Sequence, residues 1–266
     1  MLHVRIIILL FCFILFLSIC SCKEESSSTR REDGFTDRTN ISLHVILFDL
    51  SASLDSLSIE TMYIKLKNYL INLDQNKINS VVLYPVHANT ARQHYSLFRM
   101  DSIGPNEYST LASKQDEYIT ARMVDAKNVC DSINQFLMLA SNQSAILKHT
   151  CFIDAMQSAK SEFSNDKYKN AVKTVVFFGD MIEDCLRNSI DLDDDSLDLY
   201  YTEQKLDSIL AHDTFLKGVQ IKIYLSGSIK KASSLPLWLT DQKLKEFWKY
   251  VFVCYGADTT HITYIN

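Results

Sequence analysis

From residue 41 onward, apolar runs of strand length alternate with stretches that carry apolar residues at helical spacing. Residues 43–48 form a nearly continuous aliphatic run, and similar runs cover 80–86, 172–178, 219–225 and 262–265. Runs without polar alternation are typical of strands that are covered on both faces of a sheet. The pattern therefore predicts buried strands at these five places.

Between the strands, apolar residues recur every three or four positions, as on the buried face of a helix. Helices are predicted at 59–73, 111–140, 152–163 and 244–251, with Thr240 or Asp241 as the N-cap of the last. The stretch around Tyr95–Phe98 is expected to form a hairpin with the strand at 80–86. Such alternation favours an α/β fold with a doubly wound, mostly parallel sheet flanked by helices.

Composition narrows the class further. The 266 residues are 47% hydrophobic, which suffices for a sizeable core, and the low counts of glycine (6) and proline (3) exclude collagen-like and turn-dense all-β proteins. The net charge is −5, and no basic run exceeds two residues. Binding to a phosphate backbone needs clustered lysine and arginine, so no nucleic-acid partner is expected.

The N-terminus has the features of a targeting segment. Arg5 precedes twelve apolar residues at 6–17, which would cover about 18 Å as a helix, whereas the hydrocarbon core of a membrane is about 30 Å thick. Ser21-Cys22 then resembles a bacterial lipobox, and Cys20 is the weaker candidate because the bulky Ile19 precedes it. We predict a lipoprotein signal peptide at 1–21 and lipidation of Cys22; a plain cleaved signal is the alternative.

A polar segment follows the proposed lipidation site. Residues 23–40 contain only one large apolar side chain, Phe35, so 22–40 is predicted to be a disordered tether. The run Lys23-Glu24-Glu25 before three serines resembles surface-export signals of outer-membrane lipoproteins. The expected location is the cell envelope, lipid-anchored in the outer membrane, with possible surface exposure. The domain is predicted to span 41–266.

Polar residues lie next to the ends of three predicted elements: after two strands and before one helix. Asp49, Ser51 and Ser53 form a D-x-S-x-S pattern directly after the first strand, Thr150 precedes the helix at 152–163, and Asp180 follows the strand at 172–178. Ligands of doubly wound sheets bind beyond the carboxyl ends of the strands. These residues are therefore the candidates for the chemistry of the chain.

In this order, the motifs resemble a von Willebrand factor A domain with a metal-ion-dependent adhesion site. The resemblance implies that Asp49, Ser51, Ser53, Thr150 and Asp180 hold a divalent cation. Mg²⁺ is the expected ion, with Mn²⁺ or Ca²⁺ as alternatives, because hard cations prefer oxygen ligands. Neutral hydroxyls leave the cation electron-poor, so a carboxylate of a partner protein would complete its coordination.

The chain departs from the family pattern in two respects. Gly179-Asp180-Met181 stands where the family commonly has Thr-Asp-Gly, and the distance from Ser53 to Thr150 implies an insertion around 87–120. Other interpretations of the motif remain open. Ser51, Ser53 or Asp55 could cap the following helix, and Thr150 could likewise be only an N-cap.

Two acidic groups lie outside the motif. Glu183 and Asp184 could tune its charge or simply face water. The acidic run at 191–198 lacks the glycine and glutamate of an EF-hand loop, since Ser196 and Thr202 occupy those positions, so a solvated insertion is the better interpretation.

Four cysteines follow the tether: Cys130, Cys151, Cys185 and Cys254. In an oxidising compartment they permit two disulfides in any of three connectivities, and spacing does not choose among them. If the adhesion-site resemblance holds, Cys151 and Cys185 each lie just past a metal ligand, which makes them the expected pair. No C-x-x-C pair or histidine cluster indicates a zinc site.

The sequence also limits the function. It contains no G-x-S-x-G elbow, P-loop or H-E-x-x-H motif, so an enzyme and a small-molecule substrate are not expected. The favoured function is a lipid-anchored module that binds an acidic side chain of a protein partner through the cation. The alternative is a structural or assembly lipoprotein with a vestigial metal site and metal-independent protein contacts.

Overall fold

The computed structural model describes residues 41–51, 56–88, 95–103, 112–140, 147–185, 190–192, 204–208, 210, 213–226 and 239–265. Its strands are β1 (Ile41–Asp49), β2 (Ile78–Val86), β3 (Phe98–Ile103), β4 (Val172–Gly179), β5 (Gln220–Leu225) and β6 (Ile262–Ile265). Its long helices are α2 (Ser56–Ile71), α3 (Ala112–Ala140), α4 (Phe152–Phe163) and α6 (Asp241–Cys254). The predicted signal peptide (1–21), the tether (22–40) and residues 193–198 of the acidic run lie outside the described residues.

The six strands form one sheet in the order β3-β2-β1-β4-β5-β6. All neighbouring strands are parallel except β2 and β3, which pair antiparallel at the edge. This is the strand order of a doubly wound sheet. The α/β fold class predicted from the sequence, with a doubly wound and mostly parallel sheet flanked by helices, is therefore confirmed.

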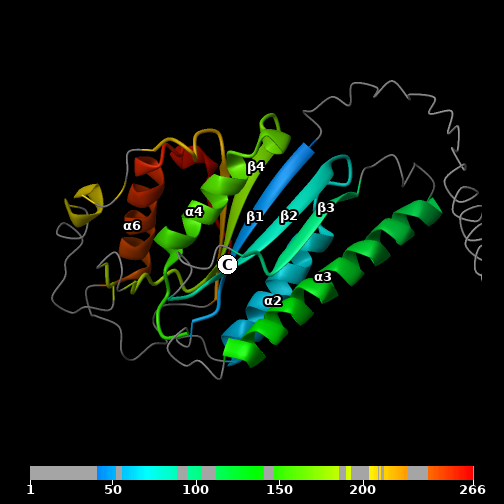
Figure 1. Cartoon of the computed structure of the whole chain (residues 1–266), viewed down its shortest axis with the longest axis horizontal. Coiled ribbons are helices and arrows are strands. Elements are labelled where there is room, and N and C mark those ends of the chain that lie inside the picture. Colours follow the sequence, from blue (N-terminus) through cyan, green and yellow to red (C-terminus); the bar gives the residue numbers. More distant parts are fainter. Residues whose placement is uncertain are drawn as a thin grey trace, which may run out of the picture. The chain divides into compact units, whose positions relative to one another are not determined.

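Helices cover both faces of the sheet (Figure 1). The side chains of β1 contribute alternately to the cores on the two faces. Leu43, Val45 and Leu47 belong to the core formed with α4 and α6. Ile46 and Phe48 belong to the core formed with α2 and α3. This two-sided burial explains why the sequence of β1 is apolar almost throughout.

The predicted strands and helices are confirmed within a few residues at their ends. Thr240 is the N-cap of α6, because its hydroxyl accepts a hydrogen bond from the Lys243 amide. The hairpin is also confirmed, since β3 pairs with β2 at Leu83 and Phe98. Within the insertion predicted at 87–120, the structure places β3 and the start of α3, and residues 89–94 and 104–111 lie outside the described residues.

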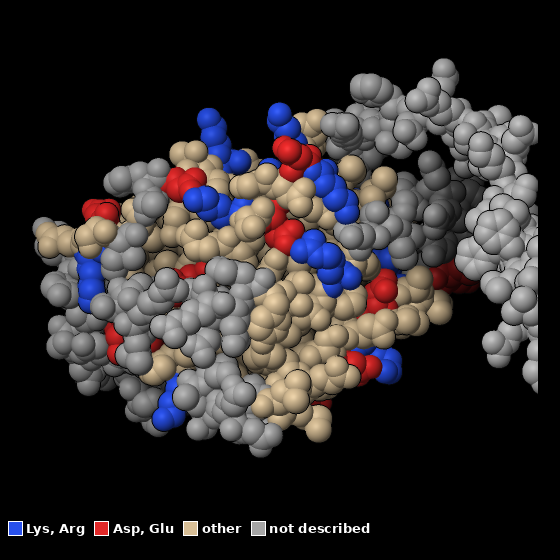
Figure 2. All heavy atoms as spheres, in the orientation of Figure 1, with Lys and Arg blue, Asp and Glu red and all other residues tan. Residues whose placement is uncertain are grey.

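The described surface has mixed charge. On the face drawn in Figure 2, basic and acidic side chains are interspersed, so this face offers no continuous basic surface. Among the described helices, none combines the length and the hydropathy that a membrane span requires.

Candidate functional site

Asp49 ends β1 at the carboxyl edge of the sheet and is fully buried. Its Oδ1 accepts a hydrogen bond of 2.8 Å from the amide of Ser51, which is itself buried. Its Oδ2 is also buried, but no group hydrogen-bonds it within the described part of the chain. Buried polar atoms usually have a partner, so this oxygen is the exceptional feature of the site.

The charge environment of Asp49 is unfavourable for its ionised form. Burial raises the pKa of Asp49 well above its usual value, and the negative charges of Asp180 and Asp184 raise it further. Hydrogen bonds from Ser51 act in the opposite direction without cancelling the rise. No ion pair of the described residues involves Asp49. The edge thus gathers carboxylates around an acid that no cationic side chain neutralises.

Asp180 follows β4, the strand that pairs with β1. Its Oδ1 accepts a hydrogen bond from the Ile182 amide, which shapes the loop after the strand. Met181 adopts a φ of 64°, a left-handed conformation that costs a non-glycine residue about 1–2 kcal/mol. The buried Met181 side chain and the hydrogen bond from Trp248 Nε1 to the Met181 carbonyl (2.7 Å) hold the loop in this conformation.

Two consecutive residues of this loop, Asp184 and Cys185, bind the segment that carries Thr150. Asp184 accepts a hydrogen bond from the Thr150 amide and lies 3.2 Å from the His149 ring nitrogen Nδ1. A disulfide joins Cys185 to Cys151, with the two Cα atoms 4.8 Å apart. The loop after β4 and the segment before α4 are therefore fixed to each other, at the same edge as Asp49.

The start of α4 is capped from outside the helix. Cys151 occupies the N-cap position without a side-chain hydrogen bond, so Thr150 is not the N-cap, contrary to one interpretation of the sequence. The buried Glu183 takes this role instead, because its Oε2 accepts from the amides of Phe152 (2.7 Å) and Ile153 (3.2 Å). A carboxylate is well suited to the positive end of a helix dipole.

The structure thus gathers four of the five predicted ligands, Asp49, Ser51, Thr150 and Asp180, at the carboxyl edge of the sheet. Ser53 lies outside the described residues. The sequence left open whether Glu183 and Asp184 tune the charge of the site or face water. Facing water is wrong for Glu183, which is fully buried, whereas Asp184 is partly exposed. Their position just after β4 and Asp180 was the signal that the sequence offered.

A second group of potential ligand atoms lies beside this edge. The sulfurs of Cys151 and Cys185 and a carboxylate oxygen of Asp154 lie within 4.8 Å of one another. Both sulfurs belong to the disulfide, so neither is a thiolate, the form in which cysteine binds metals. This group is therefore a disulfide with a neighbouring carboxylate, and Asp49 and Asp180 remain the better ligands.

Gly179 allows the close approach of Asp49 and α4. A Cβ atom at this position would lie 2.7 Å from the Asp49 Cβ, 2.8 Å from the Phe152 Cζ and 2.9 Å from the Asp49 Oδ2. Gly179→Ala is expected to lower the free energy of unfolding by about 1–3 kcal/mol, because buried neighbours must shift. It should also weaken cation binding, which titration with Mn²⁺ would measure.

Gly218→Ala is the matched control for this substitution. Gly218 has a φ of +74°, and a Cβ there would meet no atom within 4 Å. Its replacement costs only the backbone strain, about 1 kcal/mol, and should leave cation binding unchanged. Equal Mn²⁺ affinity of Gly179→Ala and the unaltered chain would show that the Asp49 geometry is not needed for binding.

Comparison with known proteins gives a distant likeness. No protein-family model matches the sequence, and no curated protein does. Among solved structures, the chain is similar to the manganese-loaded TRAP protein of Plasmodium vivax, at 13% identity and a TM-score of 0.37. The match covers 85% of this chain and 69% of that chain. At this distance, the site must be judged from its own residues.

Proposed function

We propose that the chain is a protein-binding module, not an enzyme, whose carboxyl-edge site holds a divalent cation and presents it to a carboxylate of a partner. The observation that carries this proposal is the buried Asp49 Oδ2, which no described group hydrogen-bonds although two further carboxylates lie nearby. A divalent cation would satisfy this oxygen and offset the repulsion between Asp49 and Asp180. Mg²⁺ is the favoured ion, and Mn²⁺ and Ca²⁺ share its preference for oxygen ligands.

The donor set fits such an ion. Asp49 and Asp180 supply carboxylates, and Ser51, Thr150 and Ser53 add hydroxyls. Thr150 is buried, and its amide is held by Asp184 at the same edge, so its hydroxyl would be one of these donors. With only two charged ligands, the bound cation would supply an electrophilic position for an incoming carboxylate.

The chain's own residues would preset this geometry. Ser51 orients Asp49 through its amide, and Asp184 and the disulfide fix the backbone at Thr150. Because the ligands are held before the cation arrives, little side-chain entropy is lost on binding.

Mn²⁺ provides a direct test, because it enhances the relaxation of water protons when it binds a protein. The full-length chain is expected to bind Mn²⁺, to lose it to Mg²⁺ and to a chelator, and to show reduced enhancement when an aspartate-containing peptide is added. A matched peptide with asparagine in place of aspartate should have no effect. If Mn²⁺ does not bind, the alternative of an assembly lipoprotein with metal-independent contacts is favoured. The same holds if the chain captures envelope proteins equally well with and without chelator.

We further propose that the module is anchored to the cell envelope by a lipid on Cys22, in an outer-membrane lipoprotein with possible surface exposure. The lipobox resemblance at Ser21-Cys22 supports this proposal. Cys22→Ala is expected to move the protein from the detergent phase to the aqueous phase in a partitioning experiment, because the acyl chains are lost. Cys20→Ala is the control, and unchanged partitioning of Cys22→Ala would refute the anchor.

A further inference from the structure

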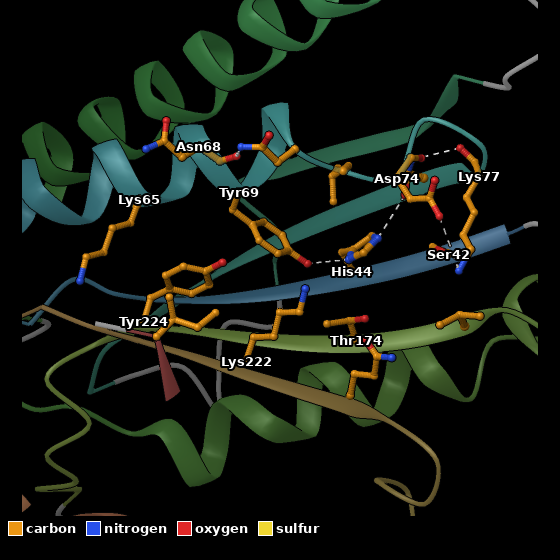
Figure 3. A pocket seen from close by; sticks show the side chains of 16 residues that line it. Ser42, His44, Lys65, Asn68, Tyr69, Asp74, Lys77, Thr174, Lys222 and Tyr224 are labelled. Carbon is orange, nitrogen blue, oxygen red and sulfur yellow. Dashed lines mark hydrogen bonds and ion pairs between the residues drawn. The ribbon is translucent and has the colours of Figure 1, made fainter. Parts of the chain in front are cut away.

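A second hollow lies on the sheet face that α2 covers, toward the amino ends of β1, β4 and β5 (Figure 3). Its volume is about 530 Å³, within the range of about 300–1,000 Å³ found for small-molecule sites. Lys65 and Tyr69 extend into it from α2, and Lys222 and Tyr224 extend from β5. It is thus distinct from the Asp49 site, which lies at the carboxyl ends of the strands.

The floor of this hollow is polar where the fold would favour apolar residues. On this face β1 continues into the core with Ile46, and β4 with Val176, whereas His44 and Thr174 stand earlier on the same strands. His44 pairs in register with Thr174, and both are less than 10% exposed. Central strands of such sheets are normally apolar on both faces, so folding does not explain this row.

The polar groups of the floor are held in fixed orientations. Asn79 Nδ2 donates to the carbonyls of Asp74 (2.7 Å) and Lys77 (3.0 Å), which turns its Oδ1 toward His44 Nε2 at 3.3 Å. His44 Nε2 is therefore the donor, and Nδ1 accepts from the Tyr69 hydroxyl at 2.6 Å. Burial lowers the pKa of His44 to about 4, which agrees with this neutral form.

The walls of the hollow carry an excess of positive charge. Lys65, Lys77 and Lys222 line it with a single carboxylate, that of Asp74, which lies 3.9 Å from Lys77 Nζ. Lys222 Nζ lies 5.4 Å from the centre of the Tyr69 ring, and no ion pair of the described residues involves Lys222 or Lys65. Lys65 Nζ donates to the Leu225 carbonyl at 2.8 Å, so Lys222 is the ammonium group that faces the hollow without an acidic partner among the described residues.

We propose that this hollow binds a small acid that carries hydroxyl groups, such as a phosphorylated or carboxylated sugar. The acid group would pair with Lys222, for which the described residues provide no carboxylate partner. The hydroxyls would meet the buried side chains of Ser42 and Thr174, and Tyr69 and Tyr224 offer aromatic surface. Preset polar groups and aromatic walls of this kind give a small-molecule site its specificity.

Calorimetric titration of the full-length chain with glucose 6-phosphate, glucuronate, inorganic phosphate and glucose tests the proposal. The two sugar acids are expected to bind saturably, with at least one binding more tightly than inorganic phosphate, and glucose is expected to bind more weakly than either. Lys222→Met keeps the side-chain length but removes the charge, and should weaken binding of the sugar acids at least about tenfold. Thr174→Val should also weaken binding of the sugar acids, because it removes the Thr174 hydroxyl that would contact a ligand hydroxyl.

Lys249→Met is the matched control, because Lys249 is exposed on α6, which packs on the opposite face of the sheet. The affinity of Lys249→Met for the sugar acids should equal that of the unaltered chain. Thermal unfolding would show that all variants are folded. The proposal is overturned if neither sugar acid binds saturably, if glucose binds as well as the acids, or if Lys222→Met and Lys249→Met bind equally. The ligands and variants of this test do not involve the Asp49 site, so its outcome neither supports nor contradicts the proposed cation site.

Discussion

Asp49→Asn is expected to stabilise the cation-free chain and to remove its response to divalent cations. Asparagine has nearly the same shape as aspartate and keeps the oxygen that accepts from the Ser51 amide. It removes a buried charge whose pKa is raised by burial and by Asp180. At pH 7 in chelator, we expect the free energy of unfolding to rise by about 1–3 kcal/mol, because folding no longer buries this carboxylate beside Asp180.

In the presence of Mn²⁺ or Mg²⁺ the order of stability should change. The unaltered chain is stabilised by cation binding. Asp49→Asn lacks a carboxylate ligand, so its affinity for Mn²⁺ should be lower by a factor of roughly ten or more. Urea unfolding with and without cation measures both effects. Asp154→Asn is the control beside the disulfide and should retain Mn²⁺ binding. If Asp49→Asn were destabilising in chelator and bound Mn²⁺ normally, Asp49 would be a structural residue.

Removal of the Cys151–Cys185 disulfide has the second large expected effect. The bond closes a loop with a sequence separation of 34 residues. On the chain-entropy estimate, its loss lowers the free energy of unfolding by about 3–4 kcal/mol. The double variant Cys151→Ala/Cys185→Ala should also bind Mn²⁺ more weakly. The β4 loop would then hold this segment chiefly through Asp184, which accepts from the Thr150 amide, and Glu183, which accepts from the Phe152 amide.

Cys130→Ala is the control for the disulfide. Cys130 is half-buried on α3 and forms no disulfide in the part of the chain that the structure describes. Its replacement should therefore change neither the loop closure nor the cation affinity. Peptide mapping without reductant would establish the pairing in the unaltered protein. Similar unfolding free energies for the double variant and Cys130→Ala would contradict a stabilising role of the bond.

The sequence alone determined which segments are strands and helices. Apolar runs at 43–48 and 172–178 and helical spacing at 152–163 are local patterns, and each reports the surroundings of its own segment. The carboxyl ends of parallel strands meet at one edge, so a strand-end position also sufficed to place Asp49 and Asp180 together.

Only the tertiary structure decided how the segments around the site are joined. Glu183 caps α4 although it lies about 30 residues from the amides that it accepts from, and no periodicity encodes such a contact. β3 lies at the edge of the sheet and pairs on one side only, so its apolar pattern is weaker than that of the central strands.

In the hollow beneath α2, too, the sequence predicts the strand, whereas the tertiary structure decides the partners of its polar residue. His44 lies inside an apolar run and was counted as part of a buried strand, which is correct. Its partners Tyr69 and Asn79 lie 25 and 35 residues further along the chain. A sequence pattern records that a position is buried, but the partners of a buried polar group are set by which elements pack against it, and this depends on the packing of the whole chain.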